Sequence, residues 1–110
     1  MAKYNNTKTT IDGIKFDSKK ESARYSELRL LLKSGLIREL ELQPRFEIQP
    51  GYVKNGKKIR KIEYVADFKY FDVEKMAYIV EDVKGMKTEI YKLKKKLVEY
   101  VYPKVTIIET

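Results

Sequence analysis

Cysteine and histidine are both absent from this sequence of 110 residues. Without cysteine, the chain has no disulfide, no thiolate zinc site and no cysteine nucleophile. Without histidine, it has no Ser-His-Asp triad, no histidine-ligated zinc and no histidine base. An enzyme of this composition must therefore work with carboxylates, lysines, tyrosines and a hard cation that prefers oxygen ligands.

Long hydrophobic runs are also lacking. The first ten residues, MAKYNNTKTT, contain no apolar segment of the kind that a signal peptide needs, and no later run is long enough to cross a bilayer. We therefore expect an intracellular protein that is not secreted. Its length fits a single domain over residues 1–110, in which residues 1–10 form a flexible arm.

Positive charge, in contrast, is abundant. The sequence holds 24 basic and 16 acidic residues, a net charge of +8 and a pI near 9.5. Such a balance favours a polyanionic partner, first nucleic acid and second an anionic membrane. No basic amphipathic helix with aromatic anchors is present, so the sequence predicts no membrane partner.

The first half of the sequence predicts a helix between β-hairpins. In TTIDGIKF (9–16), Asp12-Gly13 indicates a tight hairpin, and a helix then runs from Asp17 or Ser18 to about Ser34. Its apolar stripe comprises Tyr25, Leu28, Leu31 and Leu32. Strands are expected at 36–42 and 45–49, and Asn55-Gly56 is the strongest hairpin signal in the chain.

The second half predicts strands followed by a crossover helix. A long strand over 61–71, a turn at 72–75 and a strand over 76–84 precede a helix over 88–102 and a final strand over 104–109. The inward residues of this helix are expected to be Ile90, Leu93, Leu97 and Val101. The order αβββαβ predicts an α/β fold, a central mixed sheet with helices packed on it.

Charges interrupt two of these strands. IVEDVKG (79–85) begins like a buried strand and then contains Glu81, Asp82 and Lys84, although buried charges are costly unless they are paired or bind a metal. Alternation places Asp82 and Lys84 on one face and Glu81 on the other. A charged strand segment of this kind, taken alone, is typical of a solvated strand face.

Asp67, in the middle of YVADF, interrupts the preceding strand in the same way. If the two strands pair about the turn at 72–75, Asp67 lies opposite residue 80 or 82. Two neighbouring carboxylates repel each other unless they are protonated or neutralised. A divalent cation, with Lys84 beside it, would neutralise them.

Glu21 is a third candidate acid, and its position has two interpretations. It lies on the same side of the first predicted helix as the apolar stripe, and so could point towards the other two acids. Equally, Ser18-Lys19-Lys20-Glu21 has the S-x-x-E pattern of a helix capping box.

These motifs resemble those of the PD-(D/E)XK nuclease superfamily. FDSKKESARY, LELQPRF, YVADFKY, VEDVKG and YKLKKKL are more closely similar to a family of small phage endonucleases akin to Holliday junction resolvases, over residues ~11–110. The resemblance implies a restriction-endonuclease-like core and a bacterial host cytoplasm. It makes Asp67 and Asp82 the motif acids, Lys84 the motif lysine and Glu21 the helix acid. Ala66 stands where the superfamily pattern has proline.

The chemistry that this implies is phosphodiester hydrolysis dependent on Mg²⁺, with Mn²⁺ as a substitute and no organic cofactor. Glu21, Asp67, Asp82 and the Val83 carbonyl would be metal ligands. Lys84 would orient the attacking water or stabilise charge, and the products would carry 5′-phosphate and 3′-hydroxyl ends. Glu81 could replace Asp82 only after a register slip. The resemblance adds three possible auxiliaries of the site: Gln43, Tyr91 and Lys94.

Three groups of basic residues are candidate phosphate contacts, although lysine runs on a surface also occur for solubility alone. The candidates are Lys19, Lys20, Arg24, Lys54, Lys57, Lys58, Arg60, Lys61, Lys92, Lys95 and Lys96. The leading hypothesis is a structure-selective DNA endonuclease that acts on four-way junctions as a C₂ homodimer. The alternatives are another Mg²⁺-dependent nicking or end-processing nuclease, an RNA-directed nuclease, and a non-catalytic nucleic-acid-binding protein.

Overall fold

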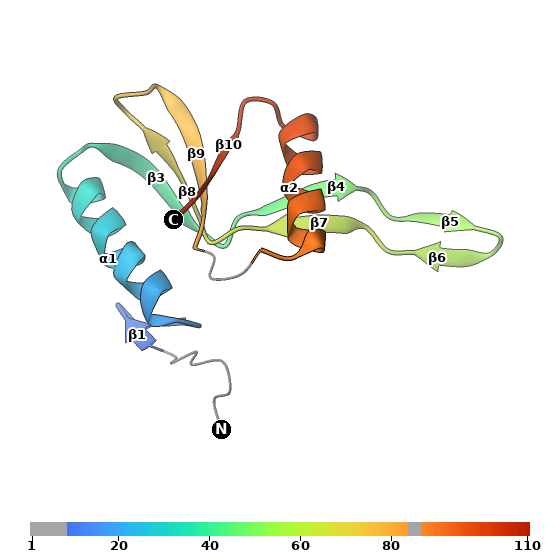
Figure 1. The fold of residues 1–110 in the computed structure, drawn as a ribbon, viewed down its shortest axis with the longest axis horizontal. Coiled ribbons are helices and arrows are strands. Elements are labelled where there is room, and N and C mark those ends of the chain that lie inside the picture. Colours follow the sequence, from blue (N-terminus) through green and yellow to red (C-terminus); the bar gives the residue numbers. More distant parts are fainter. Residues whose placement is uncertain (1–8, 84–86) are drawn as a thin grey trace.

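A computed structural model describes residues 9–83 and 87–110. This part of the chain forms two helices and ten strands (Figure 1). The helices are α1 (Lys19–Lys33) and α2 (Glu89–Val101). The strands are β1 (Thr9–Ile11), β2 (Ile14–Phe16), β3 (Ile37–Leu42), β4 (Arg45–Gln49), β5 (Tyr52–Lys54), β6 (Lys57–Ile59), β7 (Ile62–Val65), β8 (Phe68–Asp72), β9 (Ala77–Asp82) and β10 (Thr106–Glu109). None of the helices in these two ranges is both long and apolar enough to cross a membrane.

The central sheet has four strands in the order β10-β9-β8-β3. β3 and β9 both run antiparallel to β8, whereas β10 runs parallel to β9. Because parallel neighbours need a crossover connection, α2 joins β9 to β10 as a βαβ unit. The predicted mixed sheet with helices packed on it is therefore confirmed.

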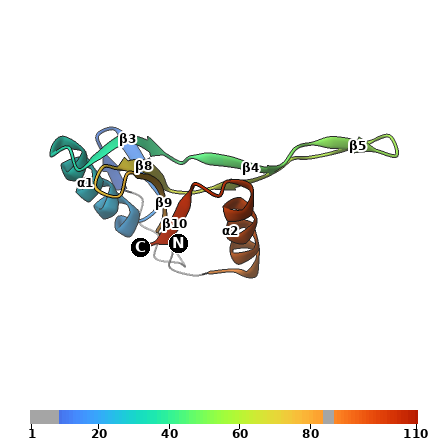
Figure 2. The same ribbon diagram turned by 90° about the horizontal axis from the view of Figure 1, so that it is seen from above.

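The two helices cover opposite faces of this sheet (Figures 1 and 2). Tyr25 and Leu28 of α1 pack in one buried cluster with Ile79, whereas Val98 of α2 packs in a second cluster with Val80. Successive residues of a strand point to opposite faces. The alternation of β9 thus separates an α1 side from an α2 side.

Turn residues end the elements where the sequence predicts. Asp12 and Gly13 have φ values of 53° and 76° between β1 and β2, and Asn55 and Gly56 have 51° and 77° between β5 and β6. Positive φ at both central residues is the requirement of the hairpin turn that Asp-Gly and Asn-Gly favour. Ser18 caps the start of α1, as predicted.

β5 and β6 form an arm that extends away from the central sheet (Figures 1 and 2). Residues 50–62 are exposed throughout. The strands β4 and β7 pair with each other and connect this arm to the sheet. A hairpin with so little packing is only marginally stable in isolation, so its Asn-Gly turn and its continuity with β4 and β7 must hold its shape.

The single strand predicted over 61–71 is wrong, because the chain divides there into β7 and β8. β7 pairs with β4, but β8 pairs with β3 and β9. The change of partners occurs at Ala66 and Asp67, whose backbone groups bond to Pro44 and Gln43 on the adjacent segment. The change of strand partner therefore lies at Asp67, the residue that the sequence predicts to interrupt this strand.

The predicted inward face of α2 is also wrong. Ile90, Leu93 and Val101 are 68%, 57% and 42% exposed and Leu97 is only half-buried, whereas Tyr91 and Val98 are the buried residues of the helix. Successive residues of a helix are rotated by about 100° about its axis, so two neighbouring apolar stripes repeat with the same period. The period alone therefore does not show which stripe is buried. The ring of Tyr91 packs near Tyr64, and this contact selects the stripe that faces the sheet.

Candidate active site

Asp67 lies directly before β8, at the edge of the sheet where β9 ends. Phe68 and Glu81 form the last pair of this antiparallel ladder, so Asp67 and Asp82 are the next residues of the two strands at the same end of the sheet. That their side chains lie opposite each other stays a prediction. The backbone amide of Asp67 donates to the Glu81 carbonyl at 3.0 Å, and its Oδ2 accepts from the Val83 amide at 2.7 Å. A charge-assisted bond of this length fixes the orientation of the carboxylate.

Asp82 is fully buried at the end of β9. Val80, two residues earlier, packs on the α2 side, so the side chain of Asp82 points to that side as well. The pKa of Tyr91 is raised by its burial, by its hydrogen bond to Glu109 and by the charge of Asp82. Asp82 therefore lies within electrostatic range of Tyr91, one of the predicted auxiliary residues.

Glu21 and Gln43 join Asp67 in the lining of one cavity of about 200 Å³. Glu21 comes from the first turn of α1. Ser18 Oγ accepts from its backbone amide at 3.1 Å, which forms the Ser18 half of the predicted capping box. Glu21 also lines the cavity that Asp67 lines, so the bond of its backbone amide to Ser18 is compatible with a ligand role for its carboxylate.

Gln43 adopts an uncommon backbone conformation, with φ at 50°. Its amide donates to the Asp67 carbonyl at 3.0 Å, directly before the buried Pro44. Non-glycine residues in the left-handed region cost of order 1 kcal/mol or more, and they cluster at functional sites. This geometry holds Gln43 beside Asp67 and supports its predicted place at the site.

Glu81, fully buried on the α1 side, belongs to a network that the sequence did not predict. Arg24 Nε donates to Glu81 Oε1 at 2.7 Å and Nη2 to Oε2 at 2.6 Å, and the Tyr70 hydroxyl donates to the same carboxylate. The pKa of Tyr70 is raised by burial and by this bond. Arg24, a predicted phosphate contact, instead binds Glu81 and, through Nη1, Glu27. Nothing in the local pattern indicated a contact across 57 positions.

Glu109 is a second residue that the prediction missed. It pairs with Asp82 in the parallel ladder of β10 and β9 and therefore shares its face. The Tyr91 hydroxyl donates to Glu109 Oε2 at 2.8 Å, and Lys87 Nζ lies 2.8 Å from Oε1. These bonds, Lys87 first, lower the pKa of Glu109. The alternation of Ile107 and Glu109 against Val80 and Asp82 is the signal that could have identified it.

Lys84, the predicted motif lysine, lies outside the described residues. Lys94 is half-buried on α2, and none of the cavities described here has it in its lining. Its predicted approach to the site therefore stays a prediction.

The other predicted basic residues lie on three surfaces. Lys19 and Lys20 are exposed at the start of α1. Lys92 and Lys96 line two surface cavities, one together with Lys87, Lys95, Glu99 and Glu109 and the other together with Glu89 and Leu93. The exposed arm carries Lys54, Lys57, Lys58, Arg60 and Lys61, of which only Lys61 pairs with an acid in the described part of the chain.

The cavity that Asp67 lines offers the carboxylates of Glu21 and Asp67, oxygen donors of the type that hard cations take, and Lys15 lies in the same lining. Glu21 and Asp67 share the cavity, whereas Asp82 is not part of its lining. Within residues 9–83 and 87–110, no three acids form a ready metal-binding group. Mg²⁺ usually binds through one or two carboxylates and retains several waters. The pair therefore fits Mg²⁺ better than a cation that needs a full protein cage.

Comparison with known families gives one match. Residues 1–109 match the family described as "Protein of unknown function (DUF1064)", and the chain belongs to this family. No curated protein matches the chain. No solved structure matches it either.

Proposed function

We propose that this member of the DUF1064 family is a Mg²⁺-dependent DNA endonuclease that selects branched DNA, in particular the four-way Holliday junction. One observation carries the proposal: Glu21 of α1 lines the same cavity as Asp67, and Asp67 adjoins the end of the β8–β9 ladder at which Asp82 also lies. The order of α1, β3, β8, β9, α2 and β10 around a mixed sheet supports a restriction-endonuclease-like core.

Glu21, Asp67, Asp82 and the Val83 carbonyl are the proposed ligands of Mg²⁺, with Mn²⁺ as a substitute. When bound, the metal would lower the pKa of a water and offset charge at the phosphate. Asp67 is oriented for such a role by its 2.7 Å bond from the Val83 amide. Lys84 is proposed to orient the attacking water, and the products would carry 5′-phosphate and 3′-hydroxyl ends.

The exposed arm supports DNA as the substrate. Between Glu47 and Glu63 the sequence has five basic residues and no acid. Lys54 and Lys57 are direct partners across β5 and β6, a pairing of like charges that destabilises a hairpin in isolation. Phosphates between these side chains would relieve the repulsion, and a two-stranded ribbon has the width that the major groove admits.

A homodimer completes the proposal, because symmetric cleavage of a junction needs two sites. The exposed residues Ile90, Leu93, Tyr100 and Val101 of α2, together with the half-buried Leu97, have the i, i+3, i+7 spacing of a helix–helix seam. Leu93→Asp should therefore convert the dimer to a monomer in analytical ultracentrifugation, and an unchanged sedimentation coefficient would reject this interface.

The test compares four-way junctions, linear duplexes and single strands as substrates, each with Mg²⁺ or with a chelator. Symmetric nicking of the junction that requires Mg²⁺ supports the proposal. Asp67→Asn and Asp82→Asn should abolish nicking but leave junction binding in place, because each keeps the size of the side chain. Undiminished cleavage by both variants would refute the site.

The same assay separates the alternatives. Binding without cleavage under every condition would indicate a nucleic-acid-binding protein whose acids are structural. Cleavage of linear duplex or of ends in preference to junctions would indicate a nicking or end-processing nuclease. A matched RNA duplex, included as a further substrate, tests for an RNA-directed enzyme.

A further inference from the structure

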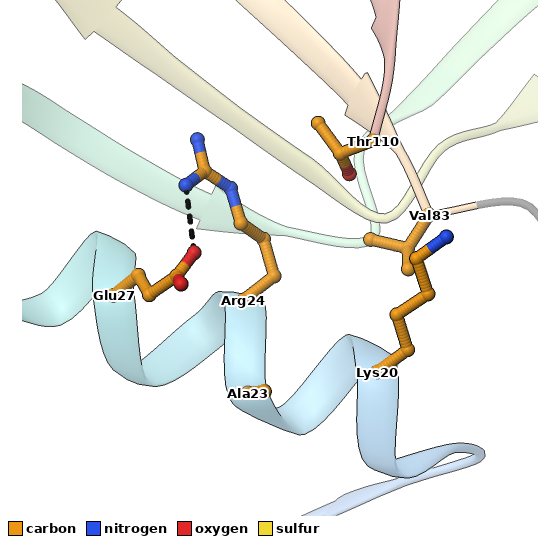
Figure 3. Close-up of a pocket in the computed structure, with 6 residues that line it drawn as sticks. All are labelled: Lys20, Ala23, Arg24, Glu27, Val83 and Thr110. Carbon is orange, nitrogen blue, oxygen red and sulfur yellow. Dashed lines mark hydrogen bonds and ion pairs between the residues drawn. The ribbon is translucent and has the colours of Figure 1, made fainter.

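A second cavity, of about 370 Å³, lies between α1 and the ends of β9 and β10 (Figure 3). It differs from the acidic cavity of Glu21 and Asp67 in the charge of its lining. The lining residues are Lys20, Ala23, Arg24, Glu27, Val83 and Thr110. Its only acidic side chain, Glu27, is paired with Arg24 at 2.9 Å, which leaves Lys20 as the basic side chain of this lining without an acidic partner among the described residues.

Two hydrogen-bond donors face this cavity. Lys20 extends from α1 to the level of Val83 (Figure 3), and it makes no ion pair or hydrogen bond with the residues that the structure describes. The Thr110 hydroxyl is buried and has no hydrogen-bond partner among those residues. Buried hydroxyls almost always have a partner. An ammonium and an unsatisfied hydroxyl together favour an anion with several acceptor oxygens.

The basic cavity adjoins the proposed active site. Val83, which lines the basic cavity, donates its amide to Asp67, which lines the acidic one. Lys20 and Glu21 are successive residues of α1 and line different cavities. The backbone amide of Thr110 also donates to the Asp82 carbonyl at 3.0 Å. A site for a cation and a site for an anion thus share the ends of the same strands.

We infer that the basic cavity binds a backbone phosphate of the strand being cut, next to the phosphodiester held at Asp67. Lys20 and the Thr110 hydroxyl bind its non-bridging oxygens, and the buried bonds of Arg24 to Glu81 fix the helix that carries Lys20. This inference rests on the proposed nuclease function. A phosphate contact of this kind fixes the register of the strand without reading its sequence.

The test pairs Lys20→Gln with DNA in which single phosphates near the cleavage point are replaced, one at a time, by uncharged methylphosphonates. Binding is measured in a chelator, so that no cleavage occurs. For the unaltered protein, one replacement should weaken binding by about tenfold, the loss expected for a charged hydrogen bond. Lys20→Gln should weaken binding of unmodified DNA by a similar factor, and the same replacement should then have no further effect.

Lys33→Gln is the matched control, because Lys33 is an exposed residue at the other end of α1. It should respond to every methylphosphonate as the unaltered protein does. Thr110→Val removes only the hydroxyl. It should reduce the loss of affinity that a methylphosphonate causes at the same position at which Lys20→Gln abolishes this loss. If Lys20→Gln and the unaltered protein lose affinity equally at every position, the phosphate site is refuted.

Cleavage in Mg²⁺ by the unaltered protein separates this inference from the function on which it rests. Absence of cleavage, together with the position-specific effect at Lys20, would reject the nuclease but retain a phosphate site. Cleavage together with equal losses at every position would retain the nuclease and reject the phosphate site.

Discussion

Replacing Arg24 by methionine should destabilise the fold strongly, because it leaves a buried carboxylate without its cation. Glu81 has no exposed surface, and the guanidinium supplies two of its hydrogen bonds, at 2.7 and 2.6 Å. The Tyr70 hydroxyl remains as a donor. Removing one partner of a buried pair costs about 3–5 kcal/mol, and the Tyr70 bond favours the lower end, about 3 kcal/mol.

Urea denaturation followed by circular dichroism measures this loss. Small proteins have slopes of about 1–3 kcal/mol per molar urea, so the midpoint should fall by about 1–3 M. Glu27→Gln is the matched control, because it removes the exposed partner of the same guanidinium. Exposed pairs contribute about 0–1 kcal/mol, so its midpoint should change little.

The double replacement of Arg24 by methionine and Glu81 by leucine identifies the cause. It removes both charges together, and a buried pair replaced by apolar residues is often neutral in stability. Most of the lost free energy of unfolding should return. An Arg24→Met variant no less stable than Glu27→Gln would show that the network does not hold α1 to the sheet.

Two further predictions concern charge. Replacing Lys54, Lys57 and Lys58 by glutamine should make DNA binding less sensitive to salt. The slope of log K against log[salt] should become about 2–3 smaller in magnitude, because each phosphate contact contributes about 0.9. An unchanged slope in a filter-binding titration would exclude the arm from the interface. Bonds from Lys87 and Tyr91 lower the pKa of Glu109 below its ordinary value of 4.5. The free energy that ionised Glu109 contributes to folding is therefore complete above pH 4.5 and is lost as the pH falls through the lowered pKa. The stability difference between the unaltered protein and Glu109→Gln should therefore be constant from pH 7 to 5 and should close in more acid solution, as measured by thermal unfolding; a difference that widens in acid would contradict the shift.

Local signals in the sequence were sufficient for most of the fold. Asp12-Gly13 and Asn55-Gly56 need positive φ, and Ser18 and Gly35 mark the ends of α1. These signals act within a few residues, so no knowledge of the tertiary structure is needed to interpret them. The break at Ala66 depends instead on which strand pairs with which, and alternation along 61–71 cannot reveal a change of partner.

The orientation of α2 shows the same limit. Its sequence carries apolar residues at two neighbouring stripes, and periodicity alone does not say which one meets the sheet. Tyr91 decides between them, because its ring reaches Tyr64 and its hydroxyl reaches Glu109. Both contacts involve residues distant in the sequence. The stripe through Leu93 remains exposed as a result.

For the candidate site, the sequence predicted positions better than partners. The turn between β8 and β9 brought Asp67 and Asp82 to the same end of the sheet, because turn length determines hairpin register. The partners of Glu81 come from α1 and from β8, and only folding brings them together. The role of Lys84 stays a prediction.

Glu81 and Asp82 are adjacent and both fully buried, yet their roles should differ. Glu81 binds Arg24 and Tyr70 on the α1 side, so Glu81→Gln should lower the free energy of unfolding by about 2–3 kcal/mol while Mg²⁺-dependent cleavage persists below the melting temperature. Asp82 faces the α2 side, and Asp82→Asn should abolish cleavage without a comparable loss of stability, because neutralising a buried carboxylate relieves its desolvation. Urea denaturation and junction cleavage, measured on both variants, test this division. If Asp82→Asn were the less stable variant and still cleaved DNA, Asp82 would be structural and the catalytic assignment would be wrong.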